Sequence, residues 1–347
     1  MKKFAFLIHP RVSAKEDMGK VFPPLKAIPE KILRWGIKHL NPIVRGKVTF
    51  PGIKEVVGWI IVIPLTGDQI YSLPRDFVFN KIIQSVQKAK KLGVEIIGLG
   101  ELISSITDKG KGLINRVDIG ITTGNSLTSA ITVKAIKKVS EMRRLELRKG
   151  KVAIVGAGGS VGKGVSLLLA EEGIPLILAD RVKSRIEDLE KKIKSLFSEN
   201  RVEITDDLKD FQKADIVIVA TSATTRIIES EHLKKGAIVY DITQPRNTSP
   251  DLLERRRDIT LIDGGVIDTP GINYGMDIGL RKEQAYACLV ETMMLALEER
   301  TNNYIGDVSI DNAKEMLKLM EKYSRYFRLA PFQGFGKPLS EKLELII

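Results

Sequence analysis

Residues 151–162 read KVAIVGAGGSVG, a short run of β-forming residues that leads directly into a cluster of glycines. The apolar spacing of Val161–Glu172 then indicates a helix, and Ile174–Ala179 has the composition of a second buried strand. Strand, turn, helix and strand in this order form the unit in which a helix N-terminus faces a pyrophosphate. The stretch therefore predicts a dinucleotide-binding site in a parallel α/β sheet.

The spacing of the glycines fits a variant of the usual dinucleotide motif. Gly156, Gly158 and Gly162 miss GxGxxG by one position, whereas Gly156, Gly159 and Gly162 give GxxGxxG. The mononucleotide motif GxxxxGK[ST] fails, because Ala157 stands at its first glycine and Gly164 at its hydroxyl residue. The residues that we expect to bind the cofactor in this turn are Gly156, Gly158, Gly159, Ser160, Val161 and Gly162.

The end of the second strand bears on the choice between NAD and NADP. Asp180 stands where an acidic residue accepts hydrogen bonds from a ribose 2′-hydroxyl, which favours NAD. Arg181 follows, and its guanidinium can pair with a 2′-phosphate, which favours NADP. These signals conflict, and the residues alone leave both cofactors open. Further cofactor contacts are expected from Thr221 and Ser222 after one apolar strand, and from Gly265 after another.

Length and composition describe an ordinary globular α/β protein. The chain has 347 residues, of which 43% are hydrophobic, enough for two domains with separate cores. We predict an N-terminal α/β substrate domain over residues 1–148 and a Rossmann-type domain with a doubly wound parallel sheet over 149–270. A C-terminal helical segment, 271–347, is expected to carry Cys288 and close the cleft. One cysteine permits no intrachain disulfide, and no metal site is predicted.

Charge and hydropathy limit the classes of partner and location. The formal net charge of +12 favours an acidic partner: nucleic acid, an anionic membrane surface or an acidic carrier protein. Nucleic acid is not expected, because no zinc-finger or RNA-binding signature accompanies the basic residues. A lysine-rich surface without a specific partner remains an alternative. No cleavable signal or membrane span is visible, so we expect a cytoplasmic protein. The oligomeric state is not indicated.

One basic and apolar stretch, residues 20–46, has several interpretations. It could lie peripherally on a membrane, cover an acyl site or pack into the core. Helices are also expected over 79–92, 126–148, 276–300 and 311–326, and a Pro- and Gly-bearing tail over 331–338.

Three features could present a substrate to the cofactor. The turn formed by residues 122–125, TTGN, could bind a carbonyl oxygen or merely cap a helix. The paired glycines after Asp263 could let a ligand approach the backbone or form a tight turn. Cys288 could be a nucleophile or a small core residue. His9 ends the first strand, where a structural role is expected.

Taken together, these motifs resemble the long-chain acyl-[acyl-carrier-protein] reductases, which form fatty aldehydes with NADPH. The resemblance extends over nearly the whole chain. It rests on His9, Gly98-Leu-Gly100 with Ser104, Thr122–Asn125, the glycine turn, Asp263-Gly-Gly-Val266 and the Gln284–Met293 segment. It implies NADPH as cofactor, with NADH not excluded, and an acidic acyl carrier protein or acyl-CoA as acyl donor. It also implies that Cys288 forms an acyl-enzyme. Thr123 and Asn125 are our candidates for oxyanion donors from their chemistry alone.

Two positions depart from that family. Glu101 replaces a glycine and places a carboxylate near the presumed active site, and Asp180 replaces a neutral residue. A direct hydride-transfer dehydrogenase of shikimate or amino-acid type is the first alternative, with Cys288 only packing. The usual Lys-Asp pair of such enzymes does not stand out. A catalytically inert NAD(P)-binding protein is the second alternative.

Overall fold

The computed structural model describes residues 2–10, 13–223 and 225–339, which form two compact units. Unit 1 contains the chain up to Gly124 together with residues 267–306 and 319–328. Unit 2 contains residues 125–266, 307–318 and the chain from 329 onward. These boundaries differ from the predicted ones, because helix α6 (Asn125–Met142) packs against a helix of the Rossmann unit. The predicted C-terminal segment is divided between the two units.

Unit 2 is built on a six-stranded sheet in the order β11-β10-β9-β6-β7-β8, and every neighbouring pair is parallel. This arrangement confirms the predicted Rossmann-type fold. Helices α7 (Ser160–Glu171) and α8 (Lys183–Leu196) connect its first three strands. The strands are β6 (Val152–Val155), β7 (Leu176–Ala179), β8 (Val202–Thr205), β9 (Ile216–Val219), β10 (Ile238–Asp241) and β11 (Thr260–Asp263).

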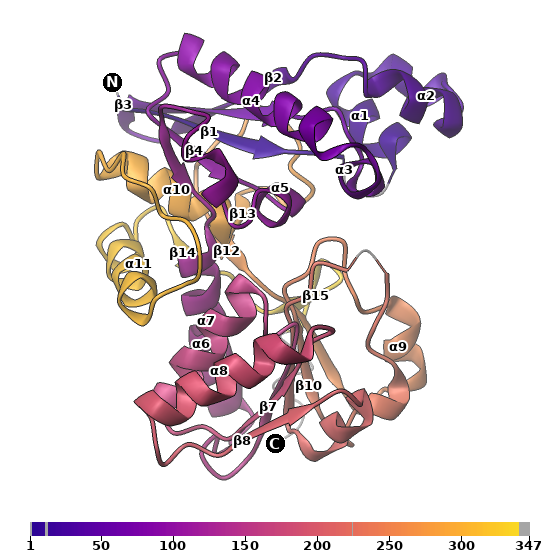
Figure 1. The fold of residues 1–347 in the computed structure, drawn as a ribbon, viewed down its shortest axis with the longest axis vertical. Coiled ribbons are helices and arrows are strands. Elements are labelled where there is room, and N and C mark those ends of the chain that lie inside the picture. Colours follow the sequence, from indigo (N-terminus) through magenta and orange to yellow (C-terminus); the bar gives the residue numbers. More distant parts are fainter. Residues whose placement is uncertain (1, 11–12, 224, 340–347) are drawn as a thin grey trace. The chain divides into compact units, whose positions relative to one another are not determined.

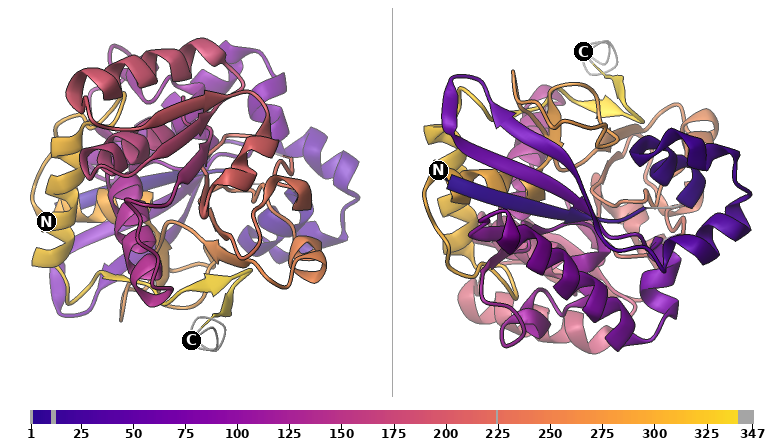
Figure 2. Two further views of the ribbon diagram at one scale, coloured as in Figure 1. Left: turned by 90° about the horizontal axis from the view of Figure 1, so that it is seen from below. Right: turned by 90° about the horizontal axis from the view of Figure 1, so that it is seen from above.

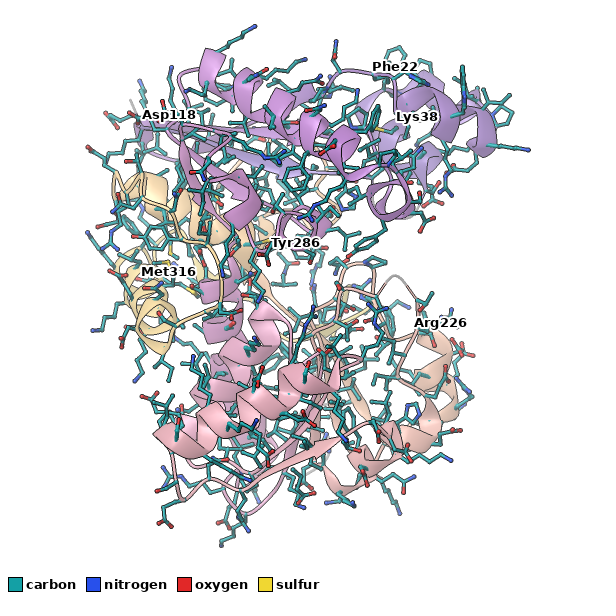
Figure 3. All side chains as sticks on the ribbon, in the orientation of Figure 1. Phe22, Lys38, Asp118, Arg226, Tyr286 and Met316 are labelled. Carbon is teal, nitrogen blue, oxygen red and sulfur yellow. The ribbon has the colours of Figure 1, made fainter. Side chains whose placement is uncertain are left out.

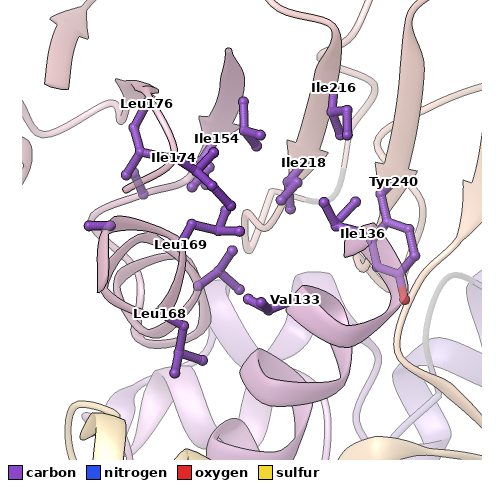
Figure 4. Packing of buried hydrophobic residues seen from close by; sticks show 14 of the residues in the cluster. Val133, Ile136, Ile154, Leu168, Leu169, Ile174, Leu176, Ile216, Ile218 and Tyr240 are labelled. Atoms are coloured by element: carbon purple, nitrogen blue, oxygen red, sulfur yellow. The ribbon is translucent and has the colours of Figure 1, made fainter. Parts of the chain in front are cut away.

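Side chains alternate between the two faces of this sheet and build one core on each face. On one face, Ile154 and Ile218 pack against Ile136 of α6 and Leu169 of α7 (Figure 4). On the other face, Val217 and its neighbours pack against side chains that include those of η3 (Leu208–Lys213) and α9 (Pro250–Arg255). Burial on both faces explains the uninterrupted apolar composition of β6, β7 and β9, whereas the edge strand β8 is only partly buried.

Unit 1 is built on a five-stranded mixed sheet in the order β2-β3-β1-β4-β5. Strands β3, β1, β4 and β5 run parallel, and β2 pairs with β3 as an antiparallel hairpin. Figure 2 (right) shows these strands side by side, with helix α4 (Arg75–Lys91) alongside them. The strands are β1 (Lys2–Ile8), β2 (Ile43–Phe50), β3 (Ile53–Val62), β4 (Ile96–Leu99) and β5 (Gly120–Thr122).

Helix α10 (Ala287–Leu297) packs against β1 and β4 of the same sheet. Gly98 permits this packing, because a Cβ at this position would overlap the hydroxyl of Thr292 on α10. The predicted helix over 276–300 is therefore too long. Residues before Ala287 form the short strand β13 (Gln284–Tyr286), and Gly279 and Glu283 have positive φ angles that a helix cannot contain.

The remaining elements are short. In unit 1, α1 (Ala14–Val21) precedes the basic, apolar stretch, and η1 (Pro23–Ala27) and α2 (Glu30–Ile37) lie within it (Figure 1). Further along unit 1 are α3 (Gly67–Ser72), α5 (Leu102–Ile106) and η2 (Lys111–Leu113). Other elements are η4 (Ser230–His232), β12 (Val266–Asp268), α11 (Ile310–Lys322) and β14 (Arg328–Leu329). The predicted tail contains a hairpin of β15 (Gln333–Gly334) and β16 (Lys337–Pro338). None of the helices in the described residues combines the length and hydrophobicity that crossing a membrane requires.

Candidate functional site

The glycine turn of unit 2 joins β6 to the N-terminus of α7, and its glycines have different steric roles. Gly156 has a φ of 82°, and a Cβ there would meet the carbonyl oxygen of Ala220 at 2.6 Å. A Cβ on Gly162 would overlap the carbonyl oxygen of Gly156, so Gly162 permits the close packing of helix on turn. Gly159 is the N-cap and has more room. The first turn of α7 presents backbone N–H groups, the arrangement that binds a pyrophosphate.

Asp180 ties the end of β7 to this turn. Its Oδ2 accepts a hydrogen bond from the backbone N–H of Gly158 at 3.0 Å, and its Oδ1 accepts one from Val182 at 2.9 Å. A Cβ on Gly158 would meet Asp180 Oδ2 at 2.8 Å and Cβ of Arg185 at 2.7 Å. The carboxylate therefore braces the glycine turn, and Arg181 beside it is exposed. The cofactor residues predicted here lie at one edge of one sheet.

The ends of β9, β10 and β11 complete this edge with a network that the sequence did not reveal. Asp241 is 1% exposed and accepts five hydrogen bonds from the backbone and hydroxyls of Thr243 and Thr248 and the backbone of Asn247. The amide oxygen of Asn247 accepts a 2.5 Å hydrogen bond from the hydroxyl of Thr221. Loop 243–248 is therefore fixed by buried polar groups, which is expensive to disrupt.

The last two predicted cofactor residues of this edge differ in their surroundings. Ser222 is exposed, beside Thr221. Gly265 has a φ of 68°, and its N–H donates to the hydroxyl of Tyr240 at 3.3 Å. Burial raises the pKa of Tyr240 to about 12, so this hydroxyl stays protonated.

In unit 1, polar side chains gather where β1, β4 and β5 end. These three strands are parallel neighbours, so their carboxyl ends share one edge of the sheet. His9 follows β1, Glu101 follows β4, and Thr122 ends β5. The start of α10 supplies Cys288 and Glu291. We call these five residues the strand-end cluster.

His9 and Glu101 form a buried pair of ionisable side chains in this cluster. Nε2 of His9 lies 3.3 Å from Oε2 of Glu101, and the side chains are 1% and 12% exposed. Nδ1 of His9 lies 2.8 Å from the carbonyl oxygen of Pro10, so this nitrogen carries a proton and orients the ring. Nε2 of His9 also accepts the backbone N–H of Leu102 at 3.4 Å. Imidazole and carboxyl groups are the side chains that most often act as general acids and bases, so this pair is the candidate for proton transfer.

The backbone of Glu101 adopts an unusual conformation. Its φ is 54° and its ψ is −130°, a region that favours glycine and strains other residues. Gly100 precedes it and allows the chain to pass close to the backbone of β1, because a Cβ at Gly100 would meet the carbonyl oxygen of Leu7 at 2.6 Å. Strain of this kind, which here holds a carboxyl group against a buried histidine, is typical of functional sites.

Cys288 lies near the N-terminus of α10, two residues after Tyr286, which Figure 3 labels. The backbone of Gly124 packs directly against it, since a Cβ on Gly124 would overlap the Cα and Cβ of Cys288. Burial, with Glu101 and Glu291 nearby, raises the pKa of the thiol to about 12. At neutral pH the thiol is therefore protonated, which is the opposite of an activated nucleophile.

The predicted oxyanion donors, Thr123 and Asn125, lie in different units of the structure. The hydroxyl of Thr122, the first residue of the predicted TTGN turn, donates to Oε1 of Glu291 at 2.5 Å. Thr123 is buried, and its backbone N–H donates to the carbonyl oxygen of Tyr304 at 3.1 Å. Asn125 begins α6 and belongs to unit 2, whereas Thr123 and Cys288 belong to unit 1. Catalytic roles for Cys288, Thr123 and Asn125 remain predictions.

Comparison with known proteins gives a partial family match. The model of the shikimate / quinate 5-dehydrogenase family matches residues 137–263, which lie within unit 2. The aminotransferase PigE of Serratia is 27% identical over 98% of this chain and 41% of PigE. Glutamyl-tRNA reductase of Synechocystis is 26% identical over 50% of this chain and 41% of that protein. The chain thus spans about two fifths of the length of these curated relatives.

A solved structure shows a similarity over most of the chain. The structure of quinate dehydrogenase of Corynebacterium glutamicum in complex with NAD aligns with 91% of this chain and 99% of its own chain. The sequence identity is 14% and the TM-score is 0.41.

These comparisons overturn the predicted membership in the acyl-[acyl-carrier-protein] reductases. The match over residues 137–263 is to shikimate and quinate dehydrogenases, and the relatives are PigE and glutamyl-tRNA reductases. The predicted reduction of a fatty acyl thioester to an aldehyde through a Cys288 acyl-enzyme is therefore wrong. The motifs behind it, a glycine turn and small residues at strand ends, are shared by Rossmann proteins of different chemistry.

Proposed function

We propose that this chain is an NAD(P)H-dependent oxidoreductase that reduces a small carbonyl compound by direct hydride transfer, as shikimate-type and amino-acid-type dehydrogenases do. The cofactor class is supported by the parallel sheet, the braced glycine turn and the family match to residues 137–263. The substrate is proposed only as a class, because the matched residues include none of unit 1.

The observation that carries the proposal is the contact of His9 with Glu101 beside a protonated Cys288. Reduction of a carbonyl needs hydride at carbon and a proton at oxygen. The reduced nicotinamide, when bound, supplies the hydride. We infer that the His9–Glu101 pair supplies the proton, so that carbonyl, reduced cofactor and proton become alcohol and oxidised cofactor. Thr122 and Glu291 hold the neighbouring end of β5 against α10 during this transfer.

The test is turnover with a cofactor deuterated at the hydride-donating carbon. Purified protein is given NADPH or NADH with dehydroshikimate, and separately with α-oxo acids and ammonium. We expect cofactor oxidation and one deuterium in the product. The variants His9→Asn and Glu101→Gln should lower kcat by about a hundredfold or more, the contribution of general acid catalysis. Cys288→Ser should retain most of the activity, and intact mass should show no substrate adduct.

Two outcomes would contradict the proposal. Loss of turnover in Cys288→Ser, with activity retained in His9→Asn and Glu101→Gln, would assign the chemistry to the thiol. Tight cofactor binding without turnover of any carbonyl offered would favour the inert NAD(P)-binding alternative.

A further inference from the structure

The helices between β1 and β2 place large apolar side chains on the surface. In the described residues, eight large hydrophobic side chains are exposed, and four of them lie between residues 22 and 40. These four are Phe22, Ile32, Trp35 and Leu40, and their exposed fractions range from 43% to 67%. We call them the apolar patch. Ile32 and Trp35 are three residues apart on α2 and therefore share one face of it. Contiguous apolar surface on a folded protein often marks an interaction surface.

The patch is not a failure of core packing, because the same helices have a separate buried side. Leu33 and Ile37 of α2 pack with Met18 of α1 and Val62 of β3. Ile32 and Trp35 lie on the opposite side of α2, where Gly36 also has no neighbour within 4 Å of an added Cβ. Helix α2 is therefore apolar on two sides, and only one of them is covered by unit 1.

The charges within residues 22–40 are mostly positive, and Asp68 of α3 pairs with one of them, Arg34, at 3.1 Å. Between residues 22 and 40 the basic residues are Lys26, Lys31, Arg34 and Lys38, and the acidic residue is Glu30. Glu30 is already engaged at the start of α1, where its oxygens accept the backbone N–H groups of Ala14 and Lys15 at 2.9 Å. Figure 3 labels Phe22 and Lys38 in this part of unit 1.

We propose that this surface binds the headgroup region of a bilayer rich in anionic phospholipid. Aromatic and aliphatic side chains would enter the boundary between headgroups and acyl chains, with tryptophan preferred at that depth. Each lysine beside them should raise the affinity of the protein for an anionic surface about fivefold. A second copy of the chain is a poorer occupant, because it would bring a patch of the same positive charge. This inference does not depend on the proposed reaction.

The experiment uses the full chain with vesicles of phosphatidylglycerol and, separately, of phosphatidylcholine. The chain has two tryptophans, so the variant Trp59→Phe leaves Trp35 as the reporter. We expect its emission to shift to shorter wavelength and the protein to sediment with phosphatidylglycerol vesicles. Binding should be much weaker on phosphatidylcholine and should fall with added salt.

Two sets of variants separate the apolar and the charged contributions. Ile32→Ser combined with Trp35→Ser should weaken binding about tenfold or more, whereas Leu196→Ser on α8, at 53% exposure, should change nothing. Lys31→Glu with Lys38→Glu should also weaken it at least about tenfold, and Lys191→Glu should not. Far-UV circular dichroism confirms that each variant is folded.

Three results would overturn the proposal. One is absence of binding to phosphatidylglycerol vesicles by the unaltered chain. Another is binding that neither pair of variants reduces. The third is a dimer in sedimentation analysis that Trp35→Ser abolishes, without any vesicle binding, which would make this face an interface between copies.

Discussion

Carboxylates follow or end strands in both units, but the two units hold them with different partners. In unit 2, Asp180 accepts two backbone N–H groups, and three of the five donors to Asp241 are backbone amides. In unit 1, Glu101 faces the ring of His9 and Glu291 accepts a hydroxyl. Backbone amides do not exchange protons in catalysis, whereas imidazole does. The comparison gives the carboxylates of unit 2 a structural role, and under the proposed function those of unit 1 take part in proton transfer.

The largest expected effect concerns the thiol of Cys288. With its pKa raised from 9.0 to about 12, the folded protein should hold on the order of a thousandfold less thiolate than the unfolded chain at neutral pH. Alkylation by iodoacetamide, followed by intact mass, should be slower by a similar factor. Above pH 9 the native rate should keep rising while the unfolded rate levels off. Glu291→Gln should lower the thiol's pKa and speed the reaction.

The sign of the pH dependence of stability follows from the same shift. Between about pH 9 and pH 12 the folded state keeps a proton on Cys288 that the unfolded chain has released. The free energy of unfolding should therefore fall as pH rises through this window, and less so in Cys288→Ser. A native alkylation rate equal to the unfolded rate at neutral pH would contradict this assignment and weaken the contrast between the units.

The next effect concerns the close packing in unit 2. Gly162→Ala places a methyl group on the carbonyl oxygen of Gly156, a backbone atom that cannot move aside. We expect a loss of about 3 kcal/mol in the free energy of unfolding and at least about tenfold weaker cofactor binding. Urea unfolding and NADPH fluorescence measure the two. Gly36→Ala on α2 is the control, because its methyl group meets open space and a helix favours alanine. Equal behaviour of both variants would refute the steric role.

Asp180→Ala should have a smaller effect on the same turn. Removing the carboxylate leaves the N–H groups of Gly158 and Val182 without these acceptors, which costs about 2 kcal/mol in stability. NADH binding should weaken more than NADPH binding, because Arg181 remains and a repelling charge near a 2′-phosphate is lost. Asp188→Ala, an exposed residue on α8, is the matched control. An unchanged NADH-to-NADPH preference would show that Asp180 only braces the turn.

The smallest effect has the opposite sign. Glu101→Gly relieves the strain of a φ of 54° and should raise the free energy of unfolding by about 1 kcal/mol while removing activity. Asp108→Gly, at a φ of 49° on an exposed residue, should relieve strain without loss of activity. Thermal unfolding and turnover are measured on both. A Glu101→Gly protein that is less stable would mean that Glu101 belongs to the scaffold, as Asp180 does.

The Rossmann unit was readable from the sequence because its requirements are local. The strands inside the sheet are buried on both faces and therefore appear as apolar runs, unlike the edge strand β8, and the turn requires glycines at fixed spacing. The second strand, predicted over Ile174–Ala179, is observed as Leu176–Ala179. The unit boundary at Gly124 could not be predicted, because the long helix that follows is apolar enough to pack with either sheet.

The strand-end cluster was much harder to predict, because it joins residues far apart in the chain. His9 and Glu101 are brought together by the parallel pairing of β1 with β4, and a lone histidine gives no local signal. Glu101 was noticed only as a carboxylate where glycine was expected, and its positive φ is the physical reason for that expectation. The acidic surroundings of Cys288 depend on Glu101 and Glu291, so sequence could not reveal the thiol's pKa.

The division of the chain between the units has a consequence for its synthesis on the ribosome. Helix α10 covers one side of the sheet of unit 1, yet its residues are made after nearly all of unit 2. Until then, the face of β1 and β4 against which α10 packs has no helix to cover it. Unit 2 in turn is incomplete until residues 307–318 have been synthesised. Neither unit can finish folding as a nascent domain, so the growing chain exposes apolar strands of the kind that chaperones bind.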